Sequence, residues 1–257
     1  MEKVIKKIIC ANWKMNPLTL KEAEKLVNDI AKNITTIKKT EIAVCPPFLY
    51  LEKLRKISKK IIIGAQDAFP GDVGAFTGEV SAEMLYLLGT KYVILGHSER
   101  RALGETNDDV NKKIKASIAS GLYPILCVGE RTRDESHDYF NLIKTQLEVC
   151  LSGISKNSTA KIIVAYEPIW AISTTPDRRD ATADDSREMA VFIRKNLFDK
   201  FGKDATQIRV LYGGSVNEKT AGDFLENGGV DGLLVGQASL DAKKFSTIIK
   251  TCEALNK

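Results

Sequence analysis

Two polar residues able to move a proton follow directly after short apolar runs of the sequence. Glu167 follows the run 162–166 and precedes a proline, which predicts a buried strand with the carboxylate at its C-terminal end. His97 follows the run 92–95 and precedes Ser98, which we expect to be the N-cap of a helix. A carboxylate and an electrophile, both held rigidly, are what abstraction of a proton beside a carbonyl requires.

Each of these residues also has a structural interpretation. Glu167 can be a salt-bridged acid at the end of a strand, and His97 can be a core histidine bonded to backbone. Asn12 and Lys14 follow the first apolar run, and alternate residues of an extended chain share a side, so both are expected to face the same region. The same pair is also compatible with a surface lysine beside a capping asparagine.

Two glycine-containing loops follow the last two apolar runs. Gly213, Gly214 and Ser215 follow one of them, and Gly236 and Gln237 follow the other. A lone glycine pair is usually only a turn. In parallel barrels, however, the loops after strands 7 and 8 commonly bind phosphate through backbone N–H groups. The two loops together therefore predict an anion site.

Eight apolar runs alternate with charged stretches of helical spacing, at roughly 30 residues per unit. The runs cover residues 8–11, 42–45, 61–64, 92–95, 124–128, 162–166, 208–212 and 232–235, and the clearest helical stretches are 19–32, 110–120 and 186–201. This pattern predicts an α/β protein with a (β/α)8 barrel. An open doubly wound sheet accepts the same alternation, but it usually has a glycine-rich turn after the first strand, where this chain has Asn12-Trp13-Lys14. No linker-like stretch divides the chain, so residues 1–257 are expected to form one domain.

Composition excludes several other classes of protein. The chain is 44% hydrophobic and 28% charged with a net charge of +5, and its lysines lie in scattered pairs without interleaved aromatic residues, which disfavours nucleic-acid binding. It has no signal-peptide pattern and no apolar run of membrane-spanning length, so we expect a cytoplasmic protein without membrane contact. The five cysteines are an odd number spread along the chain, which indicates buried thiols, and two distant histidines make a metal site improbable.

Seven motifs, in order and at the right spacing, show that the chain resembles the triosephosphate isomerase family along nearly its whole length. They are Ala11-Asn-Trp-Lys-Met-Asn16, Gly74-Ala-Phe-Thr-Gly-Glu-Val-Ser81, Gly96-His-Ser-Glu-Arg-Arg101, Cys127-Val-Gly-Glu130, Ala165-Tyr-Glu-Pro-Ile-Trp-Ala-Ile172, Tyr212-Gly-Gly-Ser-Val216 and Leu234-Val-Gly-Gln-Ala-Ser-Leu240. The resemblance implies interconversion of dihydroxyacetone phosphate and D-glyceraldehyde 3-phosphate through an enediolate, in glycolysis and gluconeogenesis, with no cofactor or metal.

The resemblance also assigns roles to residues. Glu167 would be the general base, and His97 the electrophile, for which the family is a known case of a neutral histidine at a helix N-terminus. Lys14 would balance the substrate's charge and Asn12 would orient its oxygens. Supporting roles would fall to Glu99, Cys127 and Tyr212.

The resemblance implies an assembly as well. Segment 71–83 resembles the family's inter-subunit loop, whose threonine, here Thr77, enters the neighbouring subunit's pocket. A homodimer is therefore expected, and a tetramer is also compatible with this pattern.

The chain departs from the family in the loop after Glu167. The family commonly has Gly-Thr-Gly-Lys-Thr-Ala there, as a lid over the substrate, whereas residues 173–181 of this chain are about three residues longer and lack both glycines. Ser173 stands where a glycine N–H ordinarily reaches the phosphate, and Gln237 stands where a second glycine is frequent. The altered lid leaves open a phospholigand-binding barrel with weakened turnover, or an isomerase of a larger phosphosugar.

Overall fold

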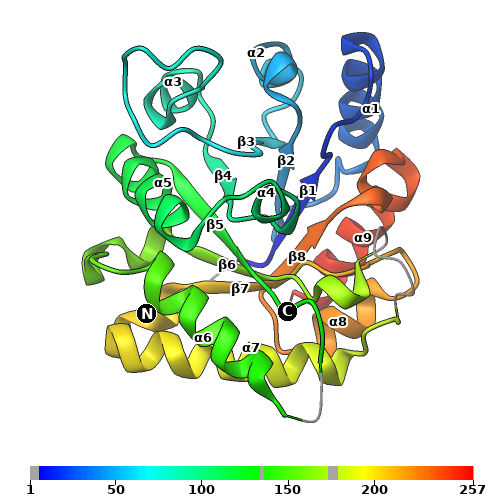
Figure 1. The fold of residues 1–257 in the computed structure, drawn as a ribbon. Helices are drawn as coiled ribbons and strands as arrows, with labels where there is room; N and C mark the ends of the chain where they lie inside the picture. The colour runs from blue at the N-terminus through cyan, green and yellow to red at the C-terminus, as the bar shows by residue number, and fades with distance from the viewer. Residues whose placement is uncertain (1–5, 134–135, 173–178, 257) are drawn as a thin grey trace.

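The computed structural model describes residues 6–133, 136–172 and 179–256. Over these residues eight parallel strands form a closed barrel in chain order, with β1 hydrogen-bonded to both β2 and β8 (Figure 1). The strands are β1 (Ile8–Asn12), β2 (Glu41–Cys45), β3 (Ile62–Ala65), β4 (Tyr92–Leu95), β5 (Tyr123–Val128), β6 (Ile163–Tyr166), β7 (Arg209–Tyr212) and β8 (Gly232–Val235). The predicted (β/α)8 barrel is confirmed.

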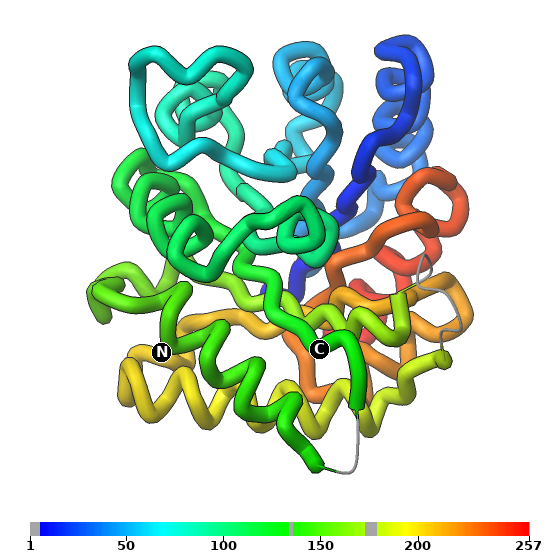
Figure 2. The backbone as a smooth tube through the Cα atoms, viewed as in Figure 1, coloured from blue at the N-terminus to red at the C-terminus, as the bar shows by residue number. Residues whose placement is uncertain are grey.

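Helices surround the barrel on its outer side (Figure 1). The α-helices are α1 (Leu20–Asn33), α2 (Leu51–Leu54), α3 (Ala82–Leu87), α4 (Ser98–Ala102), α5 (Asn107–Ser120), α6 (Asp138–Cys150), α7 (Ala183–Phe201), α8 (Ala221–Asn227) and α9 (Ala242–Leu255). The 3₁₀ helices are η1 (Phe48–Tyr50), η2 (Lys156–Lys161), η3 (Ile169–Ala171), η4 (Gly202–Gln207) and η5 (Gln237–Leu240). The backbone trace brings the first strand against the last (Figure 2). None of the helices described is both long and apolar enough to cross a membrane.

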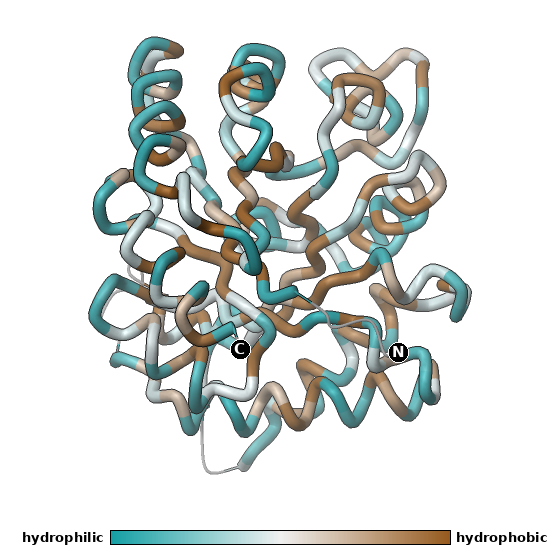
Figure 3. Tube along the Cα trace, turned by 180° about the vertical axis from the view of Figure 1, so that it is seen from behind, coloured by the Kyte–Doolittle hydropathy of each residue, from teal (hydrophilic) through white to brown (hydrophobic). Residues whose placement is uncertain are grey.

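The strands are buried on both faces, which explains why they are continuous apolar runs rather than alternating ones. Ile8 and Cys10 of β1 belong to the cluster inside the barrel, whereas Ile9 and Ala11 pack into the layer between strands and helices. Apolar residues accordingly concentrate along the central strands and the inward sides of the helices (Figure 3). All five cysteines are buried and free, as expected from their spacing.

Strand bounds agree with the sequence prediction to within one residue, but two helices begin earlier than predicted. Helix α5 begins at Asn107 and α7 at Ala183, three residues before the apolar pattern starts in each case. Both first turns are polar, and each begins after a threonine whose hydroxyl accepts a hydrogen bond from the third helical residue, in a capping box. Hydrophobic periodicity cannot detect such a turn.

A polar cluster occupies the N-terminal end of the barrel, opposite the face where chemistry takes place in such folds. The carboxylate of Glu41 on β2 accepts from Lys91 Nζ at 3.0 Å, from Arg209 Nη1 at 2.8 Å and from the hydroxyl of Tyr92. Burial raises the pKa of Glu41, but the hydrogen bonds from Tyr92 and Arg209 and the charge of Arg209 outweigh it and lower the pKa to about 2. Strands 2, 4 and 7 are thereby joined through one anion.

We predict that Glu41→Gln destabilises the chain by about 2 kcal/mol at pH 7, after allowing for solvent screening. Because the pKa of Glu41 is about 2 in the folded chain against an ordinary 4.5, its stabilisation is present above pH 4.5 and is lost as the pH falls toward 2. Urea unfolding between pH 3 and 7 measures this. The free energy of unfolding of the variant should vary less with pH in that range. Glu52→Gln, which removes an exposed pair with Lys56, is the control and should change stability by less than about 0.5 kcal/mol.

Candidate active site

A cavity of about 530 Å³ opens at the C-terminal end of the barrel. It is lined by Asn12 and Lys14 at and just after the end of β1, by His97 after β4 and by Glu167 after β6. The loops after β7 and β8 complete the wall with Gly213, Gly214, Ser215, Gly236 and Gln237. The residues that the sequence singled out from distant positions therefore meet in one cavity.

Glu167 is the first residue after β6, and its carboxylate lies on the cavity floor. Its Oε1 is 3.1 Å from His97 Nε2, and its Oε2 accepts a hydrogen bond from Ser98 N at 3.2 Å. The residue is only 3% exposed, and burial raises its pKa, but His97, the N–H of Ser98 and Lys14 together hold the pKa of Glu167 below its ordinary value of 4.5. Glu167 is therefore a buried carboxylate that stays ionised at neutral pH.

His97 follows β4 and is itself the N-cap of α4, so the prediction that Ser98 caps this helix is wrong. Its Nδ1 accepts a hydrogen bond from Glu99 N at 3.2 Å, because the imidazole takes the place of the usual short capping side chain. With Nδ1 acting as acceptor, the proton of the neutral ring lies on Nε2, facing Glu167. Burial lowers the pKa of His97, whereas the carboxylate of Glu167 in contact with it raises the pKa, and the net direction is upward.

Lys14 reaches the cavity by a route that differs from the predicted one. Strand β1 ends at Asn12, and Lys14 has a left-handed backbone with φ of 53°, rather than continuing an extended strand. The Oδ1 atom of Asn12 accepts from Lys14 N at 3.0 Å and so supports this turn. The ammonium of Lys14 lies 2.6 Å from Glu99 Oε1. A cation in a strained turn at the wall of the cavity fits a functional role better than a surface one.

The glycine pair after β7 is required by close packing. A Cβ at Gly213 would lie 3.0 Å from Glu167 Cγ, and one at Gly214 would collide with the Tyr212 ring and lie 3.1 Å from Pro168 Cγ. The N–H of Gly213 donates to Tyr166 O at 2.7 Å, so this N–H is not available to an anion, contrary to expectation. Its neighbour Gly214 still lines the cavity.

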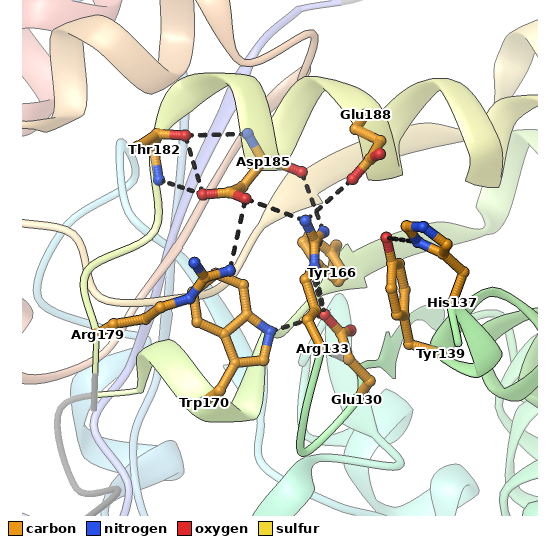
Figure 4. Close-up of polar contacts among 10 residues, drawn as sticks. All are labelled: Glu130, Arg133, His137, Tyr139, Tyr166, Trp170, Arg179, Thr182, Asp185 and Glu188. Atoms are coloured by element: carbon orange, nitrogen blue, oxygen red, sulfur yellow. Dashed lines mark hydrogen bonds and ion pairs between the residues drawn. The ribbon is translucent and has the colours of Figure 1, made fainter. Parts of the chain in front are cut away.

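The sequence did not predict the polar network around Glu130 and Arg133 (Figure 4). Buried Glu130 accepts hydrogen bonds at its Oε1 from Tyr166 Oη at 2.7 Å, Trp170 Nε1 at 2.8 Å and Arg133 Nε at 3.1 Å. Arg133 continues to Asp185 Oδ1 at 3.0 Å on α7. Glu130 stands in one of the quoted motifs, but nothing in the local sequence indicates Arg133 or Asp185, because they come from separate elements.

Other sequence-predicted residues lie outside the cavity wall. Cys127, Tyr212 and Glu99 are next to it: burial raises the pKa of Cys127, with the charge of Glu167 adding to the effect, and Tyr212 packs under Gly214. Thr77 is exposed in the loop between β3 and α3, and Ser173 lies outside the described residues. Among the side chains that the structure places, no group of three or more His, Cys, Asp or Glu is arranged to hold a metal ion.

Comparison with known proteins agrees with this geometry. The family model for triosephosphate isomerase matches residues 7–252. Similar relatives include the triosephosphate isomerases of Dehalococcoides mccartyi, 44% identical over 97% of this chain and 98% of the relative, and of Aquifex aeolicus, 42% identical over 95% and 99%. The crystal structure of triosephosphate isomerase from Bartonella henselae superposes with a TM-score of 0.85 at 36% identity, covering 96% of this chain and 99% of that one.

A closed (β/α)8 barrel that gathers a carboxylate, an imidazole and an ammonium at its C-terminal mouth has the architecture of a barrel enzyme. The named relatives identify the enzyme class as an intramolecular aldose–ketose isomerase. The chain belongs to the triosephosphate isomerase family.

Because a Cβ at position 213 would lie 3.0 Å from Glu167 Cγ, we predict that Gly213→Ala displaces this carboxylate by a few tenths of an ångström while the barrel still folds. Turnover should fall roughly tenfold, because proton transfer depends steeply on placement. Steady-state kinetics and a thermal melt measure the two effects. Gly222→Ala, where the added methyl would be at 3.5 Å from Thr251 Cγ2, is the control and should leave turnover unchanged. Unchanged turnover in Gly213→Ala would show that this contact does not position Glu167.

Proposed function

We propose that this chain interconverts dihydroxyacetone phosphate and D-glyceraldehyde 3-phosphate through an enediolate, within glycolysis and gluconeogenesis in the cytoplasm. The observation that carries the proposal is the contact between the ionised carboxylate of Glu167 and Nε2 of His97 on the floor of a cavity that Lys14 also lines. Proton transfer between adjacent carbons needs one base and one donor to the carbonyl oxygen, and this pair supplies both.

In the proposed mechanism the substrate separates Glu167 from His97. Its carbonyl oxygen takes the place of Glu167 Oε1 on the Nε2–H of His97, and Glu167 then abstracts a proton from the carbon next to the carbonyl. Once the substrate separates the two side chains, the main influence that raises the pKa of His97 is weakened, while the N–H of Glu99 on Nδ1 still favours the neutral ring. The neutral imidazole moves protons between the two oxygens of the enediolate, and Glu167 returns its proton to the other carbon.

The charge of the substrate is met by a cation and backbone groups. Lys14 would balance the enediolate and phosphate, at the cost of part of its present contact with Glu99. Asn12 would orient the substrate oxygens. The phosphate would lie against the loops of Gly214 and Ser215 and of Gly236 and Gln237, and the contribution of Ser173 remains a prediction from the sequence. No step needs a metal or cofactor.

The deciding experiment is a coupled assay with D-glyceraldehyde 3-phosphate on the purified chain and on Glu167→Gln. The variant keeps the shape of the side chain but lacks a base, so kcat should fall by at least about 100-fold with KM little changed. Glu226→Gln, an exposed carboxylate on α8, is the matched control and should keep full activity. A wild-type chain that binds triose phosphate without turning it over would reject the isomerase and support a binding barrel. Turnover of a longer phosphosugar alone would favour the second alternative.

We further propose that the active form is a homodimer built on the segments that follow β1 to β4. Large apolar side chains are exposed in each of these segments, and because the four strands are neighbours in the barrel, these side chains lie on one side of it. They include Met15, Leu18, Leu49, Val73, Phe76 and Leu103. The loop that carries Val73 and Thr77 leaves the barrel between β3 and α3, where it can reach a second subunit (Figure 1).

Val73 is 84% exposed in the single chain, so we predict that Val73→Asp leaves the fold intact but weakens the dimer. Sedimentation should show at least a tenfold rise in the dimer Kd, and specific activity should fall on dilution. Val191→Asp, at an exposed apolar residue of α7, should change neither property. An active monomer of the unmutated chain at micromolar concentration would contradict the dimer.

A further inference from the structure

Arg179 lies twelve residues after Glu167 in the sequence, but its side chain contacts Trp170, in the segment that directly follows Glu167. Its guanidinium carbon lies 4.3 Å from the centroid of the Trp170 ring, and its Nη2 lies 3.9 Å from Asp185 Oδ1 (Figure 4). A guanidinium at this distance over an indole makes a favourable cation–π contact. Trp170 is only 8% exposed, and the guanidinium of Arg179 is one of the groups that cover its ring.

Trp170 is held at its edge as well as over its ring. The indole Nε1 donates to Glu130 Oε1 at 2.8 Å, and the guanidinium carbon of Arg133 lies 5.4 Å from the ring centroid. The backbone N–H of Ile169 also donates to Glu130 O at 2.9 Å. Glu130 and the guanidinium groups of Arg133 and Arg179 therefore fix the position of η3. This helix begins two residues after Glu167.

Asp185, which pairs with Arg179, is itself held in place by hydrogen bonds. Asp185 Oδ2 accepts from both the N–H and the hydroxyl of Thr182 at 2.9 Å, while Asp185 N donates to Thr182 Oγ1 at 3.1 Å, which closes the capping box at the start of α7. Its other oxygen, Oδ1, faces Arg133 at 3.0 Å and Arg179 at 3.9 Å. Asp185 thus ties Arg179 to the first turn of a 19-residue helix.

Charge balance gives Arg179 a second effect on the network. Three carboxylates, those of Glu130, Asp185 and Glu188, lie within 3.1 Å of Arg133. With Arg179 present, two cations face three anions, and without it Arg133 alone must offset all three. Loss of Arg179 should therefore leave the repulsion among these carboxylates less offset, which disfavours the position of Glu130 and, through Glu130, loosens Trp170.

We propose that Arg179 is a positioning residue for the isomerase reaction, acting through Trp170 on the placement of Glu167. The proposal rests on the proposed function. Only Pro168 and Ile169 separate Trp170 from Glu167, and the proline restricts the backbone between them. On its other side, Glu167 N is bonded to Val128 O at 2.8 Å, and Gly129 packs so closely that a Cβ there would overlap Glu167 O. Glu167 is thus held between β5 and the fixed indole, and it moves when Trp170 loosens.

The test compares Arg179→Gln and Arg179→Lys with Arg187→Gln as control. Arg187 also lies near the start of α7 and pairs with Asp184 at 2.8 Å, but that pair is exposed and takes no part in the network around Trp170. We expect Arg179→Gln to lower kcat about 3- to 10-fold with KM within twofold. Arg179→Lys keeps a cation over the ring and should retain at least half of the wild-type kcat. Arg187→Gln should behave as wild type.

Tryptophan fluorescence supplies a readout that does not depend on turnover. The chain has two tryptophans, and Trp13 is fully buried, so a change in acrylamide quenching reports on Trp170. Quenching should increase at least twofold in Arg179→Gln and not in Arg187→Gln. If the wild-type chain proves inactive as an isomerase, the proposed function fails, while the quenching experiment still decides whether Arg179 holds Trp170.

A double-mutant cycle with Trp170→Phe tests the route from Arg179 to Glu167. If Arg179 acts through the indole, adding Arg179→Gln to Trp170→Phe should lower kcat by less than twofold. A full additional loss in that background would overturn the proposal, and so would a rise in KM at unchanged kcat, which indicates direct contact with substrate. Equal effects of Arg179→Gln and Arg187→Gln, or no change in kcat and quenching, would overturn it as well.

Discussion

The structure depends above all on the burial of one negative charge, that of Glu167. A carboxylate removed from water is stable as an anion only if donors and cations surround it. The N–H of Ser98 and the Nε2–H of His97 supply the donors, and Lys14 adds a positive charge. These groups follow β1 and β4, whereas Glu167 follows β6, and a closed barrel points the ends of these distant strands at one space.

The same burial dictates where side chains must be absent. Strands β5 and β7 flank Glu167, and on each side a glycine follows the strand: Gly129 against its carbonyl and Gly213 against its Cγ. From the sequence alone, the glycine pair after β7 indicated an anion-binding loop. In the structure its first role is to let the end of β7 approach the carboxylate of Glu167. Close packing of this kind limits the freedom of the proposed base and leaves its side chain one open direction, into the cavity.

The sequence was a good guide wherever one local property determines the structure. Apolar runs located all eight strands, because strands buried on both faces need no partner to be recognised, and the polar residues at their ends were found by position alone. Local reasoning was wrong at His97, which caps α4 in place of Ser98, and at Lys14, whose left-handed backbone replaces a strand continuation. At Lys14 the backbone itself is unusual, and at His97 an imidazole takes the place of the usual short capping side chain; in both places the side chain lines the cavity.

What the sequence did not reveal are contacts between charges that are distant along the chain. Glu41 meets Arg209 across 168 positions, and Arg133 meets Asp185 across 52, and no spacing rule links such pairs. The two clusters have different roles. The first closes the bottom of the barrel, where it affects stability, and the second surrounds Trp170 beside the proposed base. Arg179 belongs to the second cluster and lies in the part of the loop that departs from the family pattern, so physical contacts join this residue to Trp170, close to Glu167 in the chain. On the proposed role of Arg179, a change at this position also changes how Glu167 is held.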